Sequence, residues 1–187
     1  MTSPKQASLF ELQRAELARK LAEEDLPHCL LTVGHSTRPL QEFIALLQHF
    51  RVQQLVDIRH FPASRHNPQF NQATLATALR DHGIEYVWLE SLGGYRRGGY
   101  LAHMETETFR GGVVELEQLA AQKRTAIMCA ELKWWRCHRR HVSDVMTARG
   151  WSVLHIMTER RVDPHIAKSN PIRCDWPSPP AADDLPR

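Results

Sequence analysis

Short apolar segments alternate along the chain with longer amphipathic ones. Five of the apolar segments are mostly continuous and rich in strand-forming residues, which is typical of strands buried on both faces of a parallel sheet. They occupy residues 29–36, 53–59, 85–89, 125–131 and 151–156. Helical patterns between them occupy residues 39–50, 71–83, 106–123 and 137–150. This alternation predicts consecutive βαβ units, so we expect an α/β fold with a mainly parallel five-stranded sheet flanked by helices.

The two ends of the chain differ from this pattern. Leucines recur at intervals of three to five positions over residues 8–25, which predicts an amphipathic helix that ends before Pro27. The last residues lack periodicity and are rich in proline and in small or acidic side chains, which predicts a loosely ordered tail. We therefore expect an N-terminal helical extension over residues 1–28, a single α/β domain over 29–170 and a proline-rich tail over 171–187.

Composition supports one compact domain. The chain has 187 residues, of which 42% are hydrophobic and 24% charged. No apolar run approaches the ~18 residues of a membrane-spanning helix, and the polar start of the chain has no apolar core of a secretory signal. Four cysteines are too few to hold a domain of this size together by disulfide bonds. We expect a cytoplasmic protein with reduced cysteines, no membrane partner and no disulfide framework.

The positive charge is local rather than global. The net charge of the chain is +3, but residues 133–173 contain nine basic and three acidic side chains, a net +6. A local basic surface favours an anionic partner, such as a phosphate-containing small molecule or a nucleic acid. A basic face that only contacts solvent is the alternative.

Polar and reactive residues follow the predicted strands at their carboxyl ends, where ligands bind in parallel α/β sheets. His35 and Ser36 follow the first strand, and Asp57 and Arg59 end the second. Two long connections, residues 60–70 with two prolines and residues 91–105 with four glycines, are expected to be loops that shape a site. They contribute the further candidates Ser64, Tyr95 and Arg96.

The stretch of residues 129–140, CAELKWWRCHRR, is the most informative. A strand delivers Cys129 and Glu131 to the sheet edge, and a helix begins at Cys137. Free backbone N–H groups at a helix start attract an anion and lower the pKa of a thiol. We therefore expect thiolate character at Cys137 and an anion site formed by the nearby side chains Arg136, His138 and Arg139.

Other interpretations of the cysteines remain open at this point. Cysteine phosphatases place an arginine six positions after the nucleophile, whereas Arg136 follows Cys129 by seven. The two cysteines could also meet His35 and His138 around a divalent metal, although the spacing between Cys129 and Cys137 fits no common zinc motif. Both cysteines could instead be buried apolar residues. We expect no cofactor, with a divalent metal as the alternative.

Two carboxylates are candidates for acid–base chemistry. Asp57 and Glu131 lie at the ends of different predicted strands and would form such a pair if they shared one cleft. The alternative for Asp57 is an internal ion pair with Arg59, because residues two apart on a strand face the same side. His35 fits either a catalytic role or that of a hydrogen-bonded structural histidine.

Aromatic and basic residues interleave near the expected cleft. Tyr95 and Arg96 in the glycine-rich loop could stack on a base and contact an anion, as could Trp134 and Trp135. Packing in the core is the alternative for the two tryptophans. Neither G-x-x-x-x-G-K-[ST] nor G-x-G-x-x-G occurs, so the sequence does not support nucleoside-triphosphate hydrolysis or dinucleotide redox chemistry.

The ordered motifs TVGHS, VDIRHFPAS, LGG and CAE followed by CHR resemble those of the DUF488 family of small bacterial and archaeal proteins. The resemblance covers residues 31–156 and implies an α/β fold with a polar cleft, in a family without an established activity. The family motif falls here on Gly34, His35, Ser36, Asp57, Arg59, Pro62, Ser64, Leu92, Gly93, Gly94, Cys129, Glu131, Cys137, His138 and Arg139. The segment LKWWR, residues 132–136, departs from the small acidic linker of the family and predicts a more basic and aromatic rim.

These observations favour a hydrolase-type enzyme that acts on a phosphate-bearing ligand, such as a nucleotide or a modified nucleic-acid base. Arginines would hold the anion, Glu131 or Asp57 would act as acid–base, and His35 or His138 would assist. A non-catalytic nucleic-acid-binding module and a Cys/His metal or redox protein are the two alternatives. Homo-oligomerisation remains open.

Overall fold

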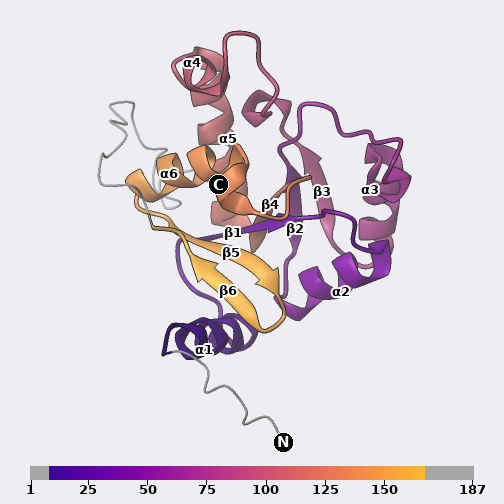
Figure 1. Cartoon of the computed structure of the whole chain (residues 1–187), viewed down its shortest axis with the longest axis vertical. Helices are drawn as coiled ribbons and strands as arrows, with labels where there is room; N and C mark the ends of the chain where they lie inside the picture. Colours follow the sequence, from indigo (N-terminus) through magenta and orange to yellow (C-terminus); the bar gives the residue numbers. More distant parts are fainter. Residues whose placement is uncertain (1–8, 167–187) are drawn as a thin grey trace, which may run out of the picture.

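The computed structural model describes residues 9–166, which form an α/β fold around one six-stranded sheet (Figure 1). The strand order across the sheet is β3-β2-β4-β1-β5-β6. All neighbouring strands are parallel except β5 and β6, which are antiparallel. The strands are β1 (Cys29–Gly34), β2 (Gln54–Asp57), β3 (Glu85–Trp88), β4 (Thr125–Cys129), β5 (Ser152–Thr158) and β6 (Arg161–Pro164).

Six α-helices connect or flank these strands within the described residues. They are α1 (Leu9–Glu23), α2 (Leu40–His49), α3 (Gln72–Asp81), α4 (Tyr100–Met104), α5 (Glu107–Gln122) and α6 (Arg139–Ala148). Short 3₁₀ turns occupy Pro68–Phe70, Glu90–Leu92 and Trp134–Arg136. None of the described helices is long and apolar enough to cross a membrane.

The predicted α/β class and mainly parallel sheet are confirmed. The prediction of five strands was one too few, because the short polar strand β6 folds back beside β5 and also packs against α1. An ion pair of 2.8 Å between Arg14 of α1 and Asp163 of β6 joins these two elements. The predicted loop 91–105 contains helix α4, and the predicted tail 171–187 lies outside the described residues. The domain boundaries stay a prediction.

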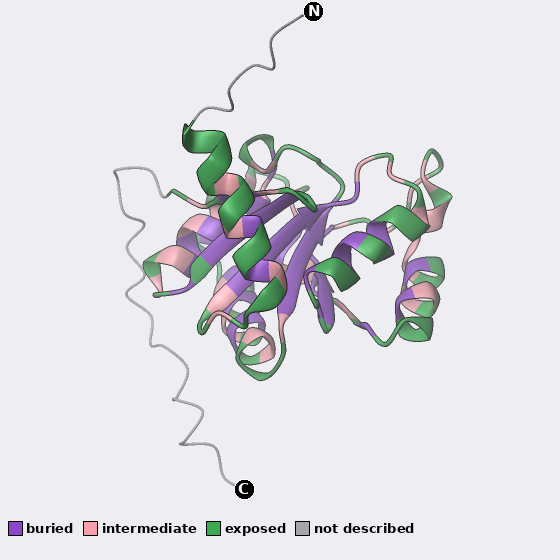
Figure 2. Cartoon of the chain, turned by 90° about the horizontal axis from the view of Figure 1, so that it is seen from below, coloured by how far each residue is buried: buried purple, intermediate pink, exposed green. Residues whose placement is uncertain are grey.

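The sheet is buried between two layers of helices (Figure 2). One apolar cluster joins α1, α2 and α3 to one face of the sheet, and a second joins α5 and α6 to the other. Successive residues of β1 alternate between them, with Leu30 in the second cluster and Leu31 in the first. Burial on both faces explains why these strands are continuous apolar runs rather than alternating ones.

Local signals end two helices where the sequence predicts. Gly83 follows α3 with φ +74°, and Gly150 follows α6 with φ +93°. Both angles lie in the left-handed region, which glycine adopts without the steric cost that a Cβ brings.

The topology brings three segments that contain polar and reactive side chains to one edge of the sheet. Strand β4 lies between β1 and β2, so the carboxyl ends of these strands are neighbours. Backbone pairing continues past the strands, because His35 N–H donates to the Cys129 carbonyl at 3.1 Å and Ser36 N–H to the Ala130 carbonyl at 2.9 Å. The residues after β1 and β4 are thereby held side by side.

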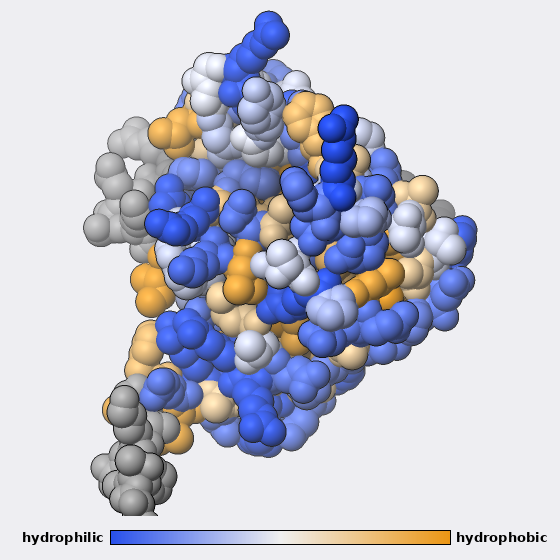
Figure 3. All heavy atoms as spheres, turned by 45° about the vertical axis from the view of Figure 1, so that its right-hand side comes forward, coloured by the Kyte–Doolittle hydropathy of each residue, from blue (hydrophilic) through white to orange (hydrophobic). Residues whose placement is uncertain are grey.

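Most of the visible surface is hydrophilic, with hydrophobic residues in separate groups (Figure 3). Two of the exposed aromatic side chains, Phe61 and Tyr95, follow strands β2 and β3 at the carboxyl edge. Their rings lie 5.8 Å apart, centroid to centroid. Both rings therefore lie exposed at the edge of the sheet where parallel sheets bind ligands.

Candidate functional site

A cleft of about 380 Å³ opens at the carboxyl ends of β2 and β4. Seven of the predicted site residues line it: Arg59, Tyr95, Cys129, Glu131, Arg136, Cys137 and His138. His60, Phe61, Gly94 and Ala130 complete the lining. The cleft therefore lies where the alternation of strands and helices predicts a ligand site.

The two cysteines lie against each other in the floor of the cleft. Cys129 Sγ, at the end of β4, is 2.6 Å from Cys137 Sγ, just before α6. Both are buried, with 1% and 7% of the residue exposed, respectively. The sequence left open whether they meet, and the structure brings them into contact.

Arg139 supports this pair from below the cleft. Its guanidinium is buried and donates from Nε to Cys129 Sγ at 3.0 Å and from Nη1 to the Thr32 hydroxyl at 3.1 Å. Nη2 donates to the Glu131 carbonyl at 2.5 Å. Arg139 is not among the residues that line the cleft, so its visible role is to hold the cysteines and the turn after β4.

His138 lies on the other side of Cys137. Its Nε2 donates to the Ile58 carbonyl at 2.9 Å, and its Nδ1 is 3.5 Å from Cys137 Sγ. The carbonyl can only accept, so Nε2 carries a proton and Nδ1 is the atom turned to the sulfur. Arg139 N–H at the start of α6 also approaches Cys137 Sγ, at 3.4 Å.

These contacts separate the pKa values of the two thiols. The pKa of Cys137 is lowered, chiefly because Cys129 donates a hydrogen bond to it, with His138 and the Arg139 charge adding to the effect. The pKa of Cys129 is raised well above its ordinary value by burial and by this same hydrogen bond. The favoured state is a Cys129 S–H that donates to a Cys137 thiolate.

Glu131 and Arg136 place a negative and a positive charge, respectively, on the wall of the cleft. Both residues are exposed and line it. Within residues 9–166 neither side chain has an ion-pair partner. They are thus free to contact a ligand.

Asp57 lies in a different environment from Glu131. Its carboxylate is fully buried and accepts from Arg59 at 2.5 Å, from the Arg59 backbone N–H at 3.0 Å and from the Tyr86 hydroxyl at 2.8 Å. Asp57 does not line the cleft, so the structure does not bring the two carboxylates together there. The ion pair with Arg59 that the period of the strand allows is the one observed.

His35 is also buried in this network. Its ring stacks on Phe70 with centroids 4.2 Å apart, and its Nδ1 and Nε2 lie 2.8 Å from the Ser36 carbonyl and 3.3 Å from Arg59 Nη1. Burial lowers the pKa of His35 to about 4, so the ring is neutral at pH 7. Nδ1 therefore donates to Ser36 and Nε2 accepts from Arg59, which fits the structural alternative for this histidine.

The other predicted residues shape the loops. Ser36 adopts a left-handed conformation with φ +51° at the turn after β1. The Ser64 hydroxyl accepts from Asn67 N–H at 3.1 Å within the loop 60–70. Arg96 pairs with Glu90 at 2.7 Å and donates to the Gly93 carbonyl, which anchors the loop that carries Tyr95.

Phe61 and His60 line the cleft although sequence reasoning did not select them. The His60 and Phe61 rings have centroids 4.3 Å apart, and both lie near Tyr95. The available signal was their position directly after the strand end that carries Asp57 and Arg59.

A second hollow of about 500 Å³ adjoins the cleft. The two share Gly94, Arg136, Cys137 and His138. Trp135, Arg140, His141 and Tyr100 complete the second lining. Cys137 therefore lies between two open spaces, both of which have Arg136 in their walls.

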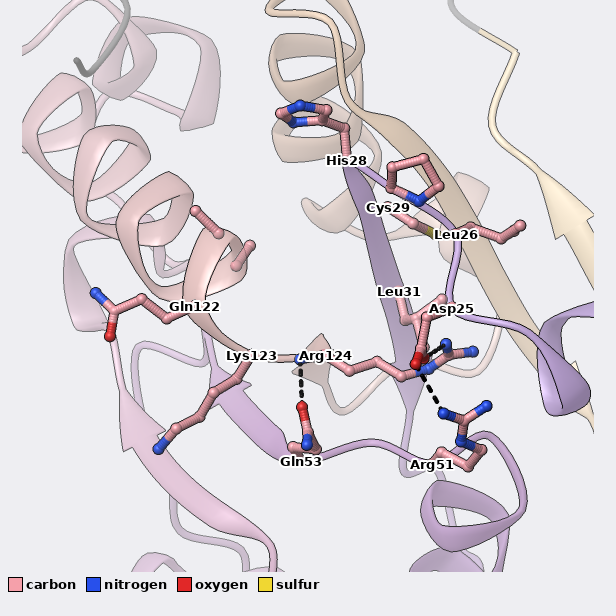
Figure 4. A pocket seen from close by; sticks show the side chains of 13 residues that line it. Asp25, Leu26, His28, Cys29, Leu31, Arg51, Gln53, Gln122, Lys123 and Arg124 are labelled. Atoms are coloured by element: carbon pink, nitrogen blue, oxygen red, sulfur yellow. Dashed lines mark hydrogen bonds and ion pairs between the residues drawn. The ribbon is translucent and has the colours of Figure 1, made fainter. Parts of the chain in front are cut away.

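Another hollow of about 460 Å³ lies at the amino-terminal end of the strands (Figure 4). Its charged side chains already have partners within the protein, because Asp25 pairs with both Arg51 and Arg124 at 2.7 and 2.6 Å (Figure 4). Arg124 also donates to the Phe50 and Glu24 carbonyls. These charges tie the end of α1 to the sheet, which is a structural role.

No group of three or more His, Cys, Asp or Glu side chains between residues 9 and 166 is arranged to hold a metal ion. His35 and His138, which the metal hypothesis placed beside the cysteines, both use ring nitrogens on backbone carbonyls. A metal or redox role of the cysteines stays a prediction.

Residues 39–146 match the family described as "Domain of unknown function DUF488". The chain belongs to the DUF488 family. Among curated proteins and among solved structures, neither search found a match.

Two glycines, Gly34 of the motif GHS and Gly94 of the motif LGG, lie where the backbone closely approaches another segment. A Cβ on Gly34 would lie 2.0 Å from the Glu131 carbonyl oxygen, and one on Gly94 would lie 2.5 Å from His138 Nδ1. Real Cβ atoms do not come so close, so only glycine allows the backbone to reach these residues. The motifs GHS and LGG thus pack directly against CAE and CHR.

Proposed function

We propose that this DUF488 protein is a hydrolase-type enzyme that acts on a phosphate-bearing ligand, such as a nucleotide or a modified nucleic-acid base, in the cleft at the carboxyl ends of β2 and β4. The observation that carries the proposal is the lining of that cleft. It combines a cation, a carboxylate and exposed aromatic rings around a floor that contains the two cysteines. These are the groups that bind and hydrolyse a ligand with a planar ring and a phosphate.

Binding would use the rim of the cleft. Arg136 is the exposed cation and would contact phosphate oxygens, for which a guanidinium offers several donors. Phe61 and Tyr95 are 63% and 73% exposed and would hold the ring of the ligand by stacking. Arg96 would act indirectly, because its bonds to Glu90 and Gly93 hold the Tyr95 loop in place.

Proton transfer would use Glu131. It is the carboxylate that lines the cleft, whereas the oxygens of Asp57 are occupied by Arg59 and Tyr86. Glu131 would move a proton between water and the leaving group, which is general acid–base catalysis. Asp57 and His35 would instead fix the turn that carries Arg59 and His60.

The test is a ligand screen by thermal shift, followed by a hydrolysis assay. Nucleotides, nucleosides, sugar phosphates and short single-stranded DNA are tested against the wild type and the Arg136→Ala variant, in the presence of a reductant. We expect a phosphate-bearing compound to raise the melting temperature of the wild type and to do so less in the variant. Its hydrolysis should be lost in Glu131→Gln. The proposal fails if no phosphate-bearing compound binds or if both variants behave like the wild type.

A non-catalytic nucleic-acid-binding module is the second candidate. It is favoured by the second hollow, where Trp135 is 40% exposed beside Arg136 and Arg140. Adjacent hollows with aromatic and cationic walls could hold successive nucleotides of a single strand. This candidate predicts single-strand binding that weakens steeply with salt, with a slope of about −0.7 per neutralised phosphate in log–log form, and no hydrolysis.

We also propose a cytoplasmic location. The adjacent cysteines would form a disulfide readily in an oxidising compartment, whereas the reduced cytoplasm keeps them as thiol and thiolate. Fractionation of cells that produce the protein, with the redox state of Cys129 and Cys137 measured by mass spectrometry, tests this location.

A further inference from the structure

We propose that Cys137 is a catalytic nucleophile, that Cys129 is the hydrogen-bond donor that activates it, and that the substrate is a phosphomonoester whose alcohol carries a planar ring. This inference rests on the proposed function, because it names the bond that the same cleft cleaves. It also gives a role to the buried thiol pair, which hydrolysis by acid–base catalysis alone would not need.

The position of Cys137 fits a nucleophile. It lines both hollows at the carboxyl edge and precedes α6, a helix of ten residues. Arg139 N–H in the first turn of that helix points at the sulfur, and His138 Nδ1 faces it at 3.5 Å. A helix start stabilises a thiolate, which is the reactive form of cysteine, and so does a histidine whose Nδ1 also carries a proton and donates it to the sulfur.

Cys129 is suited to donate rather than to attack. Only 1% of it is exposed, and Arg139 Nε already occupies its sulfur at 3.0 Å. The two sulfur atoms lie 2.6 Å apart, a contact in which either could donate, and Cys137 is the one that lines both hollows. The lowered pKa of Cys137 and the raised pKa of Cys129 agree with this division of roles.

A chain of hydrogen bonds holds Arg139 in the orientation that the thiol pair needs. Arg139 Nη1 donates to Thr32 Oγ1, which lies 2.7 Å from His155 Nδ1. His155 Nε2 is 3.0 Å from His165 Nδ1, and His165 Nε2 is 2.9 Å from Asp144 Oδ1. Each group in this chain can donate a proton to the next, from the Arg139 guanidinium to the Asp144 carboxylate. Every donor and acceptor along the chain then has a hydrogen-bond partner.

Trp134 completes this support. Its ring stacks on His155 with centroids 4.0 Å apart and planes 6° from parallel. The basic, aromatic linker LKWWR thus contributes one tryptophan to the support of the site, and Trp135 and Arg136 to its walls. His155 and Trp134 are positioning residues, since they act through Arg139 rather than on the substrate.

The charges around Cys137 favour phosphorus as the atom attacked. Arg136 lies beside Cys137 in both hollows and can neutralise phosphate oxygens, while Phe61 and Tyr95 can hold a ring on the leaving alcohol. Cysteine phosphatases take this arginine from the loop after their nucleophile. Here the cation precedes Cys137, so the sequence template misses it.

The reaction has two steps. In the first, the Cys137 thiolate forms an S–P bond while the P–O ester bond breaks. The leaving oxygen keeps the electron pair of the broken bond and receives a proton from the Glu131 carboxyl group, which becomes a carboxylate. In the second, water attacks phosphorus and gives a proton to the Glu131 carboxylate. The S–P bond then breaks, and its electrons return to Cys137 as thiolate. The products are the alcohol and inorganic phosphate.

The first experiment measures thiol reactivity without any ligand. Iodoacetamide labelling at about pH 6 is followed by peptide mass spectrometry in the reduced full-length protein. We expect Cys137 to react about tenfold faster than an ordinary thiol, and Cys129→Ala to shift its reactivity toward that of an ordinary thiol. Cys29 is the internal control, since burial raises its pKa to about 11. Labelling of Cys137 with the pH profile of an ordinary thiol overturns the inference.

The second experiment looks for the covalent intermediate with para-nitrophenyl phosphate as probe. Nitrophenolate leaves without a proton, so the Glu131→Gln variant should still complete the first step and release a burst of one equivalent of nitrophenolate. The second step should stop, because no carboxylate accepts the proton of water. The phosphoryl group should therefore stay on Cys137, where rapid acid quenching and mass spectrometry detect it. Cys137→Ala should show neither burst nor turnover. Hydrolysis by Cys137→Ala at the wild-type rate overturns the nucleophile but leaves the proposed function standing. A reactive Cys137 in a protein that neither binds nor hydrolyses phosphate-bearing compounds overturns the proposed function, and the phosphoenzyme with it.

Discussion

The imidazole ring of His138 lies directly on the backbone of Gly94, at a distance that leaves no space for a Cβ atom. The glycine belongs to the loop after β3, and the histidine belongs to the start of α6. Because His138 Nδ1 faces Cys137 Sγ, this contact transmits the position of the glycine-rich loop to the thiol. The glycine-rich loop and the segment that carries Cys137 and His138 are therefore in direct contact.

The first prediction concerns this contact. Gly94→Ala should displace His138 and thereby remove one stabilising contact of the Cys137 thiolate, so labelling of Cys137 near neutral pH should slow and its pH midpoint should rise. The measurement is the pH profile of iodoacetamide labelling. Gly111→Ala is the matched control, because a Cβ there meets no atom within 4 Å. That helical substitution should leave the profile unchanged and add about 0.5–1 kcal/mol of stability.

A second prediction tests the positioning chain. His155→Gln should break the orientation of Thr32 and Arg139 and raise the pH midpoint of Cys137 labelling, although His155 does not line the cleft. A merely structural role of His155 would lower the melting temperature without moving that midpoint. The experiment is therefore the labelling profile of the folded variant, measured well below its melting temperature.

The third prediction separates the two carboxylates. Asp57→Asn leaves the buried Arg59 guanidinium without its partner and should cost about 3–5 kcal/mol of unfolding free energy. Glu131→Gln changes an exposed side chain and should alter stability by about 0.5 kcal/mol or less while it abolishes turnover. Urea unfolding and the hydrolysis assay measure both effects. The reverse pattern, with Glu131 structural and Asp57 dispensable for folding, contradicts the assignment.

The fourth prediction concerns stability in acid. Burial lowers the pKa of His35 to about 4 and that of His155 to about 2, from an ordinary value of 6.5. Below pH 6.5 the unfolded chain binds protons that the folded protein excludes. Stability is therefore complete above pH 6.5 and falls as the pH drops toward 4, by about 1.4 kcal/mol per pH unit for each histidine.

Replacing one of these histidines tests the origin of the slope. His35→Gln should reduce the dependence of unfolding free energy on pH between 6.5 and 4, because one of the two buried histidines no longer titrates in the unfolded chain. Urea unfolding at several pH values measures it. Equal slopes in the wild type and the variant would rule out this contribution of His35.

Much of the fold follows from local patterns. Apolar strand runs, amphipathic helices and the glycines after α3 and α6 depend on neighbours within a few positions, so the sequence predicts them. The strand β6 was missed because RVDP has no strand pattern of its own and forms by pairing with β5. Helix α4 was hidden by the glycines that precede it.

The candidate site also has features that the sequence predicts and features that it does not. The sequence alone determined that reactive residues gather at the carboxyl edge, because that rule depends only on the order of strands and helices. Only the tertiary structure decided which contacts each residue makes there. It inserted β4 between β1 and β2, paired Cys129 with Cys137, and placed Arg139 beneath the cleft and Glu131 on its wall. Those outcomes depend on packing between residues far apart in the chain, which settles burial and hydrogen-bond partners and which no local pattern encodes.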